Sequence, residues 1–379
     1  MPPSLRTVEL LQRFIQSPTV SSQPIVSFAS EMAERGESVG GIVHRYETSS
    51  TKQNIVVQIG PQSSDALGLS GHMDVVPVDG QDWTMDPFAG IVKEGAVWGR
   101  GACDMKAFIA TVYSILERFP VEKMQRGLML MWTHDEEVGC VGASHLQHQC
   151  KHLSMPSNTL IGEPTSQQIF HHHGGHCTLE IIVKGFPAHS SKPYLGISAT
   201  QWLYDAWTIV REWETWMKTQ PSTVAQATPI LNVAQIEAGS AINIIPEHGK
   251  IRLGLRPMPG HNHTLLIDNL KQRLTELQTA AKEAGASILL DIIQTAPPLY
   301  TPLPTMLEKA IQKGCPNTPC LGAPFATDGG CLAEMGTQPL IWGPGSIDVA
   351  HQPNEYVRIE ELNQYEHALE TILRTWCLQ

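Results

Sequence analysis

The sequence predicts an α/β fold in two domains, on the basis of three observations. With 379 residues, the chain exceeds the size of one ordinary hydrophobic core. In its first and last parts, short apolar segments typical of buried strands alternate with segments of helical periodicity. Its middle part follows the order β-α-β-β-α-β, which is the order of a ferredoxin-like sandwich.

The first part of the chain predicts a largely parallel sheet. A helix is expected at residues 8–15 and ends before Pro18, because the residue that precedes a proline disfavours helix. A second helix is expected at residues 105–119. Buried strands are expected at residues 54–59, 66–70, 128–133 and 159–162. Strands that alternate with helices along the chain usually lie parallel to one another in the sheet.

The middle and last parts complete this organisation. The middle part predicts two helices and four strands, namely helices at 198–217 and 265–284 and strands at 178–184, 230–236, 250–255 and 287–292. The α/β pattern then resumes with a helix at 305–313, a strand at 339–342 and a closing helix at 359–376. If His351 joins acidic residues of the first part in one site, the middle part must be an insertion. We therefore expect one domain at 1–177 and 294–379 and an inserted domain at 178–293.

Composition excludes several classes of protein. With 42% hydrophobic and 17% charged residues, the chain is globular rather than disordered. Its net charge of −11 and the absence of a basic block argue against a nucleic-acid partner. No apolar run approaches the ~20 residues that cross a membrane, and residues 1–16 do not resemble a signal peptide. Eight dispersed cysteines without a Cys-x-x-Cys pair predict reduced thiols and a cytoplasmic location.

Candidate metal ligands follow the predicted strands of the first part. His72, Glu136, Glu137 and Glu163 each come just after such a strand. In open α/β sheets, ligands gather at the carboxyl ends of the strands. Imidazole and carboxylate groups without thiolate are the ligand set of zinc or a similar divalent ion in a hydrolytic site.

Two further positions of the first part carry specific expectations. Asp74 is placed to accept the second ring N–H of His72 and so to fix the tautomer of a metal-bound imidazole. Asp104 precedes a predicted helix and could cap it. Alternatively, its two carboxylate oxygens could hold two cations ~3.5–4 Å apart. Both roles of Asp104 are compatible with each other.

Together these residues predict a two-metal centre with a general base. One ion would be bound by His72, Asp104 and Glu163, and the other by Asp104, Glu137 and His351. Glu136, next to Glu137, would be the general base that takes a proton from the attacking water. A non-catalytic binding protein and a structural zinc protein are the alternatives. The former would be expected to lack a ligand or the base, and the latter to use Cys-rich sites.

The chain resembles the zinc amidohydrolase family of acetylornithine deacetylase, succinyl-diaminopimelate desuccinylase, aminoacylase and glutamate carboxypeptidase, and among these it is most similar to the acetylornithine deacetylases. The resemblance covers essentially all 379 residues. It is carried by the segments Gly71-His72-Met73-Asp74-Val75-Val76-Pro77, Trp83-Thr84-Met85-Asp86-Pro87-Phe88, Asp104-Met105-Lys106, Asp135-Glu136-Glu137, Ile161-Gly162-Glu163-Pro164-Thr165, Gly343-Pro344-Gly345-Ser346 and Ala350-His351-Gln352-Pro353.

This resemblance implies a mixed-sheet, zinc-peptidase-like catalytic domain with an inserted ferredoxin-like domain that pairs two copies into a homodimer. It implies two Zn²⁺ ions, with Co²⁺ or Mn²⁺ as possible substitutes, bound by the ligands given above. It also implies that His189 stabilises the oxyanion, and that Asn243 and Arg256 hold the substrate, Arg256 through its carboxylate. Without the resemblance, His189 would be taken for a turn residue and Arg256 for a solvated charge.

The expected reaction is hydrolysis of the amide bond of a small-molecule N-acyl amino acid, with N2-acetyl-L-ornithine as the first choice and arginine biosynthesis as the context. Succinyl-diaminopimelate, another acylated amino acid or a dipeptide are the alternatives. Two segments depart from the acetylornithine deacetylases. The acidic loop at Asp328 would suit a cationic substrate side chain, whereas the cluster His171-His172-His173 would form a polar rim near the hinge or an additional metal site.

Overall fold

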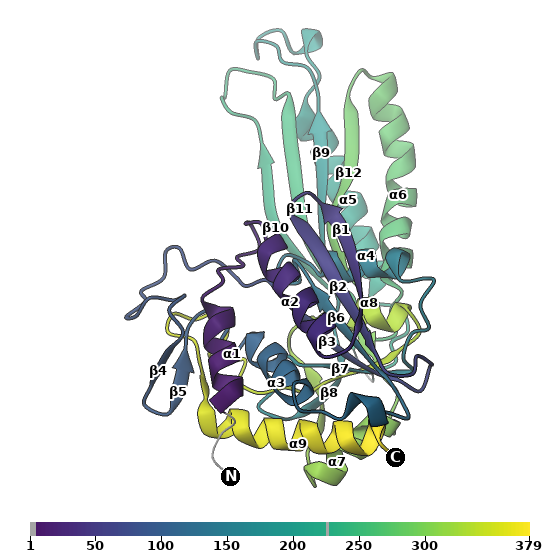
Figure 1. Cartoon of the computed structure of the whole chain (residues 1–379). Helices are drawn as coiled ribbons and strands as arrows, with labels where there is room; N and C mark the ends of the chain where they lie inside the picture. The colour runs from purple at the N-terminus through teal and green to yellow at the C-terminus, as the bar shows by residue number, and fades with distance from the viewer. Residues whose placement is uncertain (1–4, 225–226) are drawn as a thin grey trace. The chain divides into compact units, whose positions relative to one another are not determined.

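The computed structural model describes residues 5–224 and 227–379 and divides the chain into two compact units (Figure 1). Unit 1 comprises Met1–His172, Thr301–Ala323 and Thr327–Gln379, and unit 2 comprises His173–Tyr300 and Pro324–Ala326. The segment at 178–293, which the sequence predicts to be an inserted domain, lies within unit 2.

Unit 1 is built on a mixed sheet with the strand order β1-β2-β6-β3-β7-β15-β8, in which β14 also pairs with β8. These strands are β1 (Ile42–Ser49), β2 (Lys52–Ile59), β3 (Leu67–His72), β6 (Leu128–Thr133), β7 (Asn158–Ile161), β8 (Ile169–His173), β14 (Cys320–Ala323) and β15 (Gln338–Ile341). The central strands β6, β3, β7 and β15 are mutually parallel, whereas β1, β2 and β8 pair antiparallel. This arrangement confirms the predicted mixed α/β fold.

The parallel centre of the sheet explains the sequence of its strands. Every residue of β3, β6 and β7 is buried, as expected for strands that are covered on both faces. The edge strand β1 instead alternates between exposed and half-buried residues. The continuous apolar runs in the sequence therefore mark the strands that carry the site.

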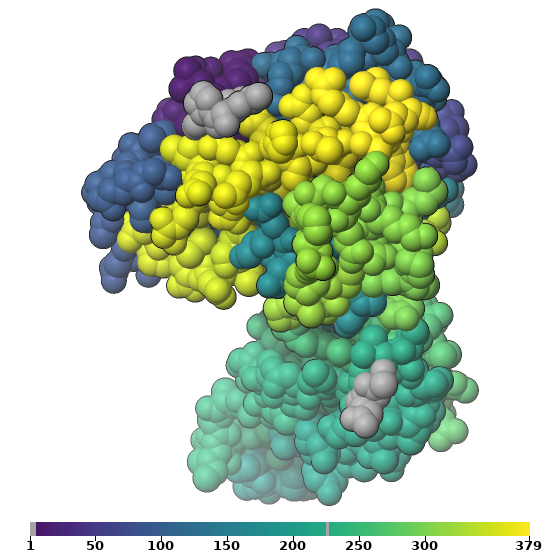
Figure 2. All heavy atoms as spheres, turned by 90° about the horizontal axis from the view of Figure 1, so that it is seen from below, coloured from purple at the N-terminus to yellow at the C-terminus, as the bar shows by residue number. Residues whose placement is uncertain are grey.

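Helices cover this sheet, and α3 is the most buried of them. The helical segments of unit 1 are α1 (Leu5–Ile15), α2 (Val26–Ser38), α3 (Lys106–Leu116), η1 (Val121–Lys123), α4 (Val141–Gln149), α7 (Met306–Gly314), α8 (Gly329–Glu334) and α9 (Ile359–Cys377). All eleven residues of α3 are buried, because it packs against α1, α9 and β3 (Figure 1). The yellow C-terminal residues form part of the surface in Figure 2.

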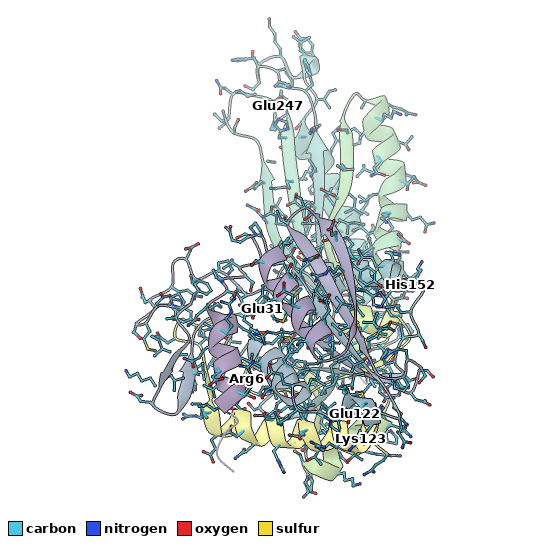
Figure 3. All side chains as sticks on the ribbon, viewed as in Figure 1. Arg6, Glu31, Glu122, Lys123, His152 and Glu247 are labelled. Atoms are coloured by element: carbon cyan, nitrogen blue, oxygen red, sulfur yellow. The ribbon has the colours of Figure 1, made fainter. Side chains whose placement is uncertain are left out.

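Smaller elements and surface ion pairs complete unit 1. A three-stranded sheet has the order β16-β5-β4 and consists of β4 (Ile91–Lys93), β5 (Ala96–Trp98) and β16 (Tyr356–Arg358). Arg6 of α1, labelled in Figure 3, donates to Glu117 at 2.6 Å, and Arg35 donates to Glu31 within α2 at 2.8 Å. Ion pairs whose side chains still reach solvent, as these do, contribute little to stability, so the buried core determines the stability of the unit.

Unit 2 has the β-α-β-β-α-β order of a ferredoxin-like sandwich. Its antiparallel sheet has the strand order β10-β11-β9-β12. The elements are β9 (His176–Lys184), η2 (Pro193–Leu195), α5 (Ala199–Met217), β10 (Ile230–Ala238), β11 (His248–Arg256), α6 (His263–Glu283) and β12 (Ser287–Ala296), followed by β13 (Leu299–Tyr300). A separate apolar core joins β9 and β11 to α5 and α6, with Trp213 fully buried in it. The sequence pattern predicted this order of elements.

Two further features of the described residues concern the length of the helices and the state of the cysteines. Among the described residues, no helix has both the length and the apolar character needed to cross a membrane. All eight cysteines are free, and six of them are buried.

Helix α3 lies close against the end of β7, next to a candidate site residue. Gly162 lies against the ring of Phe108 on α3, so that a Cβ atom at this position would come within 1.9 Å of the ring. The absence of a side chain at Gly162 thus lets the chain pass over α3 and places Glu163 at the end of the sheet.

Gly162→Ala is expected to destabilise unit 1 by about 1–3 kcal/mol, because the added methyl group must displace a ring in a closely packed core. The measurement is the apparent melting temperature of the chain. Gly314→Ala is the matched control, since nothing lies within 4 Å of a Cβ atom there. Equal melting temperatures for both variants and the parent would contradict this account of the packing.

Candidate metal centre

The parallel strands of unit 1 bring the candidate ligands to one edge of the sheet. His72 is the last residue of β3 and lies opposite Thr133, the last residue of the neighbouring β6. Glu163 follows β7, which is parallel to β3, and the loop with His351 follows β15, which is parallel to β7. Because parallel strands end at the same edge, four separate segments meet there.

The first group of potential ligands contains His72, Asp104 and Glu163. One donor atom from each lies within 4.8 Å of the others, and all three side chains are buried. His72 Nε2 is 2.9 Å from Asp104 Oδ1 and 3.8 Å from Glu163 Oε1. One imidazole nitrogen and two carboxylates can hold a zinc ion in this arrangement.

A second group shares Asp104 with the first. His351 Nε2 is 3.1 Å from Asp104 Oδ2 and 3.0 Å from Glu137 Oε2. The three residues again place their donor atoms within 4.8 Å of one another. Asp104 therefore presents Oδ1 to one imidazole and Oδ2 to the other, which is the arrangement that a carboxylate bridging two cations requires.

Burial and crowding perturb the acids of this centre. Burial raises the pKa of Glu136 and Glu163 well above the usual range and that of Glu137 to about 7. Burial also acts to raise the pKa of Asp104, but hydrogen bonds from His351 and His72 hold it well below its usual value. Positive charge is therefore what keeps carboxylates ionised here, so divalent cations fit this set of donors.

The ring of His72 contacts the backbone of Asp74 rather than its carboxylate, which was the expected partner. Its Nδ1 contacts the backbone carbonyl of Asp74 at 2.8 Å, whereas the carboxylate of Asp74 is 3.7 Å away. Because a carbonyl oxygen only accepts, this contact assigns the proton to Nδ1 and leaves Nε2 for a metal. The contact favours the expected tautomer, but the backbone carbonyl rather than the carboxylate of Asp74 makes it.

The Asp74 carboxylate holds the segment of Glu136 instead. Asp74 Oδ1 accepts the backbone N–H of Glu136 at 3.1 Å, and Oδ2 accepts the hydroxyl of Ser21 at 2.7 Å. Asp74 therefore positions the loop of the candidate base. The spacing of two residues between His72 and Asp74 could not distinguish this role from the expected one.

A buried ion pair, which sequence reasoning missed, holds the loop of Asp104. Glu355 Oε1 accepts the backbone N–H groups of Cys103 and Asp104 at 2.8 and 3.0 Å. Its other oxygen accepts from Arg100 at 2.6 Å, and both side chains are almost completely buried. The charge of Arg100 balances that of Glu355, so a buried carboxylate can fix the backbone beside the shared ligand.

The same network reaches the segment of His351. Arg100 donates to Gln81 Oε1 at 2.6 Å, and Gln81 donates to the backbone carbonyl of His351 at 2.8 Å. Two ligands of the second group, far apart in the sequence, thus share one hydrogen-bonded support. The only signal in the sequence is that Glu355 follows His351 by four residues, which is too weak to identify a partner.

Three residues expected to act on the substrate belong to unit 2. His189 Nδ1 lies 2.8 Å from the hydroxyl of Ser191, and its segment pairs with that of Asn243 through the Ser190 N–H. Arg256 is the exposed last residue of β11. Their roles in binding and catalysis, and the pairing of two copies through this unit, stay predictions.

Asp328 and the cluster His171-His172-His173 are the remaining positions. Asp328 is only 2% exposed, and its Oδ2 accepts the hydroxyl of Thr133 at 2.6 Å. It is thus a buried partner of the β6 end rather than an open acidic loop. His171 and His172 contact each other at 3.0 Å, and His173 contacts the carbonyl of Gly174. None of the groups able to hold a metal among residues 5–224 and 227–379 includes these histidines.

Comparison with known proteins confirms the expected resemblance. A family model described as peptidase family M20/M25/M40 matches residues 68–375. The acetylornithine deacetylase of Proteus mirabilis is 28% identical over 386 residues and that of Buchnera aphidicola 28% over 381, each covering 97–98% of both chains. That of Vibrio vulnificus is 30% identical over 340 residues, which cover 87% of this chain and 86% of the relative.

Solved structures share the fold at lower identity. A metallo-carboxypeptidase of Sulfolobus solfataricus superimposes with a TM-score of 0.74 at 17% identity, covering 98% of this chain and 99% of the other. A tripeptidase of Staphylococcus aureus gives a TM-score of 0.71 at 19% identity, covering 98% of each chain. The architecture of unit 1 and unit 2 is therefore a recurrent one.

Glu355→Gln is expected to weaken the binding of divalent metal by ~10–100-fold, because it removes the charge that fixes the backbone of Asp104 and pairs with Arg100. The measurement is zinc affinity in competition with a chromogenic chelator. Glu9→Gln is the control, since Glu9 is an exposed partner of Arg6. Unchanged affinity in a folded Glu355 variant would show that this network does not support the ligands.

Proposed function

Because the chain belongs to peptidase family M20/M25/M40, we propose that it is a two-metal amidohydrolase that cleaves the amide bond of N-acyl amino acids. The observation that carries this proposal is the shared carboxylate of Asp104, which faces an imidazole with each of its oxygens. N2-acetyl-L-ornithine is the preferred substrate in this proposal, because the relatives that match along nearly the whole chain are named acetylornithine deacetylases.

The proposed ligands form two groups that share Asp104. The first ion would be held by Asp104 with His72 and Glu163, and the second by Asp104 with Glu137 and His351. Two divalent cations bound there would polarise the amide carbonyl and lower the pKa of a water toward ~7. Zinc suits the mixture of imidazole and carboxylate, and cobalt or manganese can occupy the same donors.

Glu136 is the proposed general base. Its backbone is held by Asp74 at the edge of the sheet, and its carboxyl group is next to the ligand Glu137 in the sequence. In this role Glu136 accepts a proton from the attacking water and then passes it to the nitrogen of the leaving amine. A carboxylate at this position can hold the proton between these two steps.

The resemblance to the amidohydrolases assigns the remaining roles to residues of unit 2. His189 would donate a hydrogen bond to the oxyanion that forms from the substrate carbonyl. Arg256 would pair with the substrate carboxylate, since a guanidinium matches a carboxylate with two parallel hydrogen bonds. Asn243, whose segment adjoins that of His189, would add a polar contact to the substrate.

The proposal predicts metal-dependent release of amine from N2-acetyl-L-ornithine. The assay compares this compound with N-succinyl-diaminopimelate, a panel of N-acetyl amino acids and a tripeptide, each with zinc-loaded and chelator-stripped protein. We expect turnover only with metal and fastest with acetylornithine. Faster turnover of another compound would change the assigned substrate but not the proposed metal-dependent amide hydrolysis. No turnover of any of these compounds by protein with two bound metals would contradict the proposal.

Glu136→Gln is expected to lower kcat by ~10²–10⁴-fold while the protein still binds two metals, because the amide cannot accept the proton. Both kcat and the metal content by elemental analysis are measured. Glu122→Gln, at an exposed position of η1 labelled in Figure 3, is the matched control. A Glu136 variant that retains full turnover would exclude this residue as the base.

A further inference from the structure

A buried thiol lies directly beside the proposed base. The backbone N–H groups of Gly139 and Cys140 both donate to the carbonyl of Glu136 at 2.9 Å, so the chain turns back on itself there. Cys140 has a φ of 55°, which lies in the left-handed region. Its thiol is 3.7 Å from Glu136 Oε1, and the residue is 2% exposed.

A second carboxylate completes this environment. Asp328 is 2% exposed, and its Oδ1 is buried without a hydrogen-bond partner among the described residues. Burying a carboxylate oxygen costs its hydration, and the thiol of Cys140 is a polar group that interacts with this carboxyl group. Glu136, Cys140 and Asp328 each place one oxygen or sulfur atom within 4.8 Å of the other two. Asp328 therefore belongs to a set of three potential ligands.

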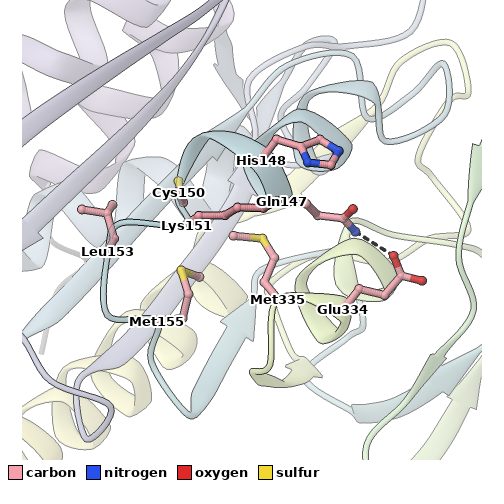
Figure 4. Close-up of a pocket in the computed structure, with 8 residues that line it drawn as sticks. All are labelled: Gln147, His148, Cys150, Lys151, Leu153, Met155, Glu334 and Met335. Carbon is pink, nitrogen blue, oxygen red and sulfur yellow. Dashed lines mark hydrogen bonds between the residues drawn. The ribbon is translucent and has the colours of Figure 1, made fainter.

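Packing between two helices holds this set together. Cys140 directly precedes α4, and Asp328 directly precedes α8. Gln147 of α4 donates to Glu334 of α8 at 2.8 Å, as Figure 4 shows, and also to the carbonyl of Cys331 at 3.2 Å. Because the two helices are fixed side by side, the residues at their starts keep their proximity.

We propose that Glu136, Cys140 and Asp328 form a third cation site, which takes a thiophilic divalent ion such as zinc in excess or cadmium. Thiolate and carboxylate are both zinc ligands, and the donor atoms around one zinc lie ~3.3–3.7 Å apart. The distance of 3.7 Å between the thiol and Glu136 already meets this requirement. On binding, the Cys140 S–H bond breaks, the sulfur binds the cation and the proton leaves to solvent.

The charge of the centre favours such a cation. Its five carboxylates carry up to five negative charges, against four positive charges from two divalent ions; these acids are Asp104, Glu136, Glu137, Glu163 and Asp328. A third ion at the carboxylate of Glu136 would prevent it from accepting a proton. If Glu136 is the base, which rests on the proposed function, the third site is inhibitory.

Cadmium titration of protein loaded with two zinc ions tests the site. We expect a third bound cation, an ultraviolet absorption band of the thiolate–cadmium bond, and loss of amide hydrolysis in parallel. The ligands of the first two ions include no thiol, but seven other cysteines are free, so the band is assigned to the third site by its loss when Cys140 is replaced. Cys140→Ser should lose the band and should require ~10–100-fold more cadmium for the same inhibition.

Cys150→Ser is the matched control, because Cys150 is a buried thiol at the other end of α4. It should behave as the parent. Asp328→Asn keeps the thiol and should shift the titration to higher cadmium, which provides a second variant should Cys140→Ser fail to fold. A band that persists in Cys140→Ser, or binding that stops at two cations, would overturn the site. If no amide is hydrolysed, the proposed function fails, while metal content and absorbance still decide the third site.

Discussion

The structure of the centre depends on one constraint, namely that the buried carboxylate of Asp104 faces two imidazoles at once. Its Oδ1 lies 2.9 Å from His72 and its Oδ2 lies 3.1 Å from His351, although these histidines are 279 residues apart (351 − 72). Such a carboxylate must be held rigidly and away from water, with positive charge nearby, since an uncompensated buried charge is strongly destabilising. Residues of unit 1 around Asp104 meet these requirements.

Three different supports meet this requirement. Glu355, neutralised by Arg100, fixes the backbone N–H of Asp104, and Gln81 extends this network to the carbonyl of His351. The backbone carbonyl of Asp74 sets the tautomer of His72, while its carboxylate holds the loop of the base. A backbone carbonyl carries no net charge, so it can orient the imidazole of His72 without adding another anion to this acidic site.

The sequence singled out the residues that the structure brings together as potential ligands, but not their supports. Continuous apolar runs such as residues 128–133 identify buried parallel strands, and parallel strands bring the residues after them together. By contrast, the apolar residues of α2 are interrupted by small and charged residues, and β1 is a partly exposed edge strand. The hydrophobic residues of these two segments therefore do not repeat at a clear helical or strand period, and the sequence did not predict either element. The contacts of Glu355 and Cys140 depend on tertiary packing, which spacing along the chain does not encode.

Asp104 is proposed to bridge two metal ions, and anomalous X-ray diffraction from zinc-soaked crystals tests this bridge most directly. We predict two anomalous peaks ~3.5–4 Å apart. Each should lie ~2.0–2.2 Å from a different oxygen of Asp104, with His72 on one peak and His351 on the other. A single peak, or two peaks of which Asp104 binds at most one, would contradict it.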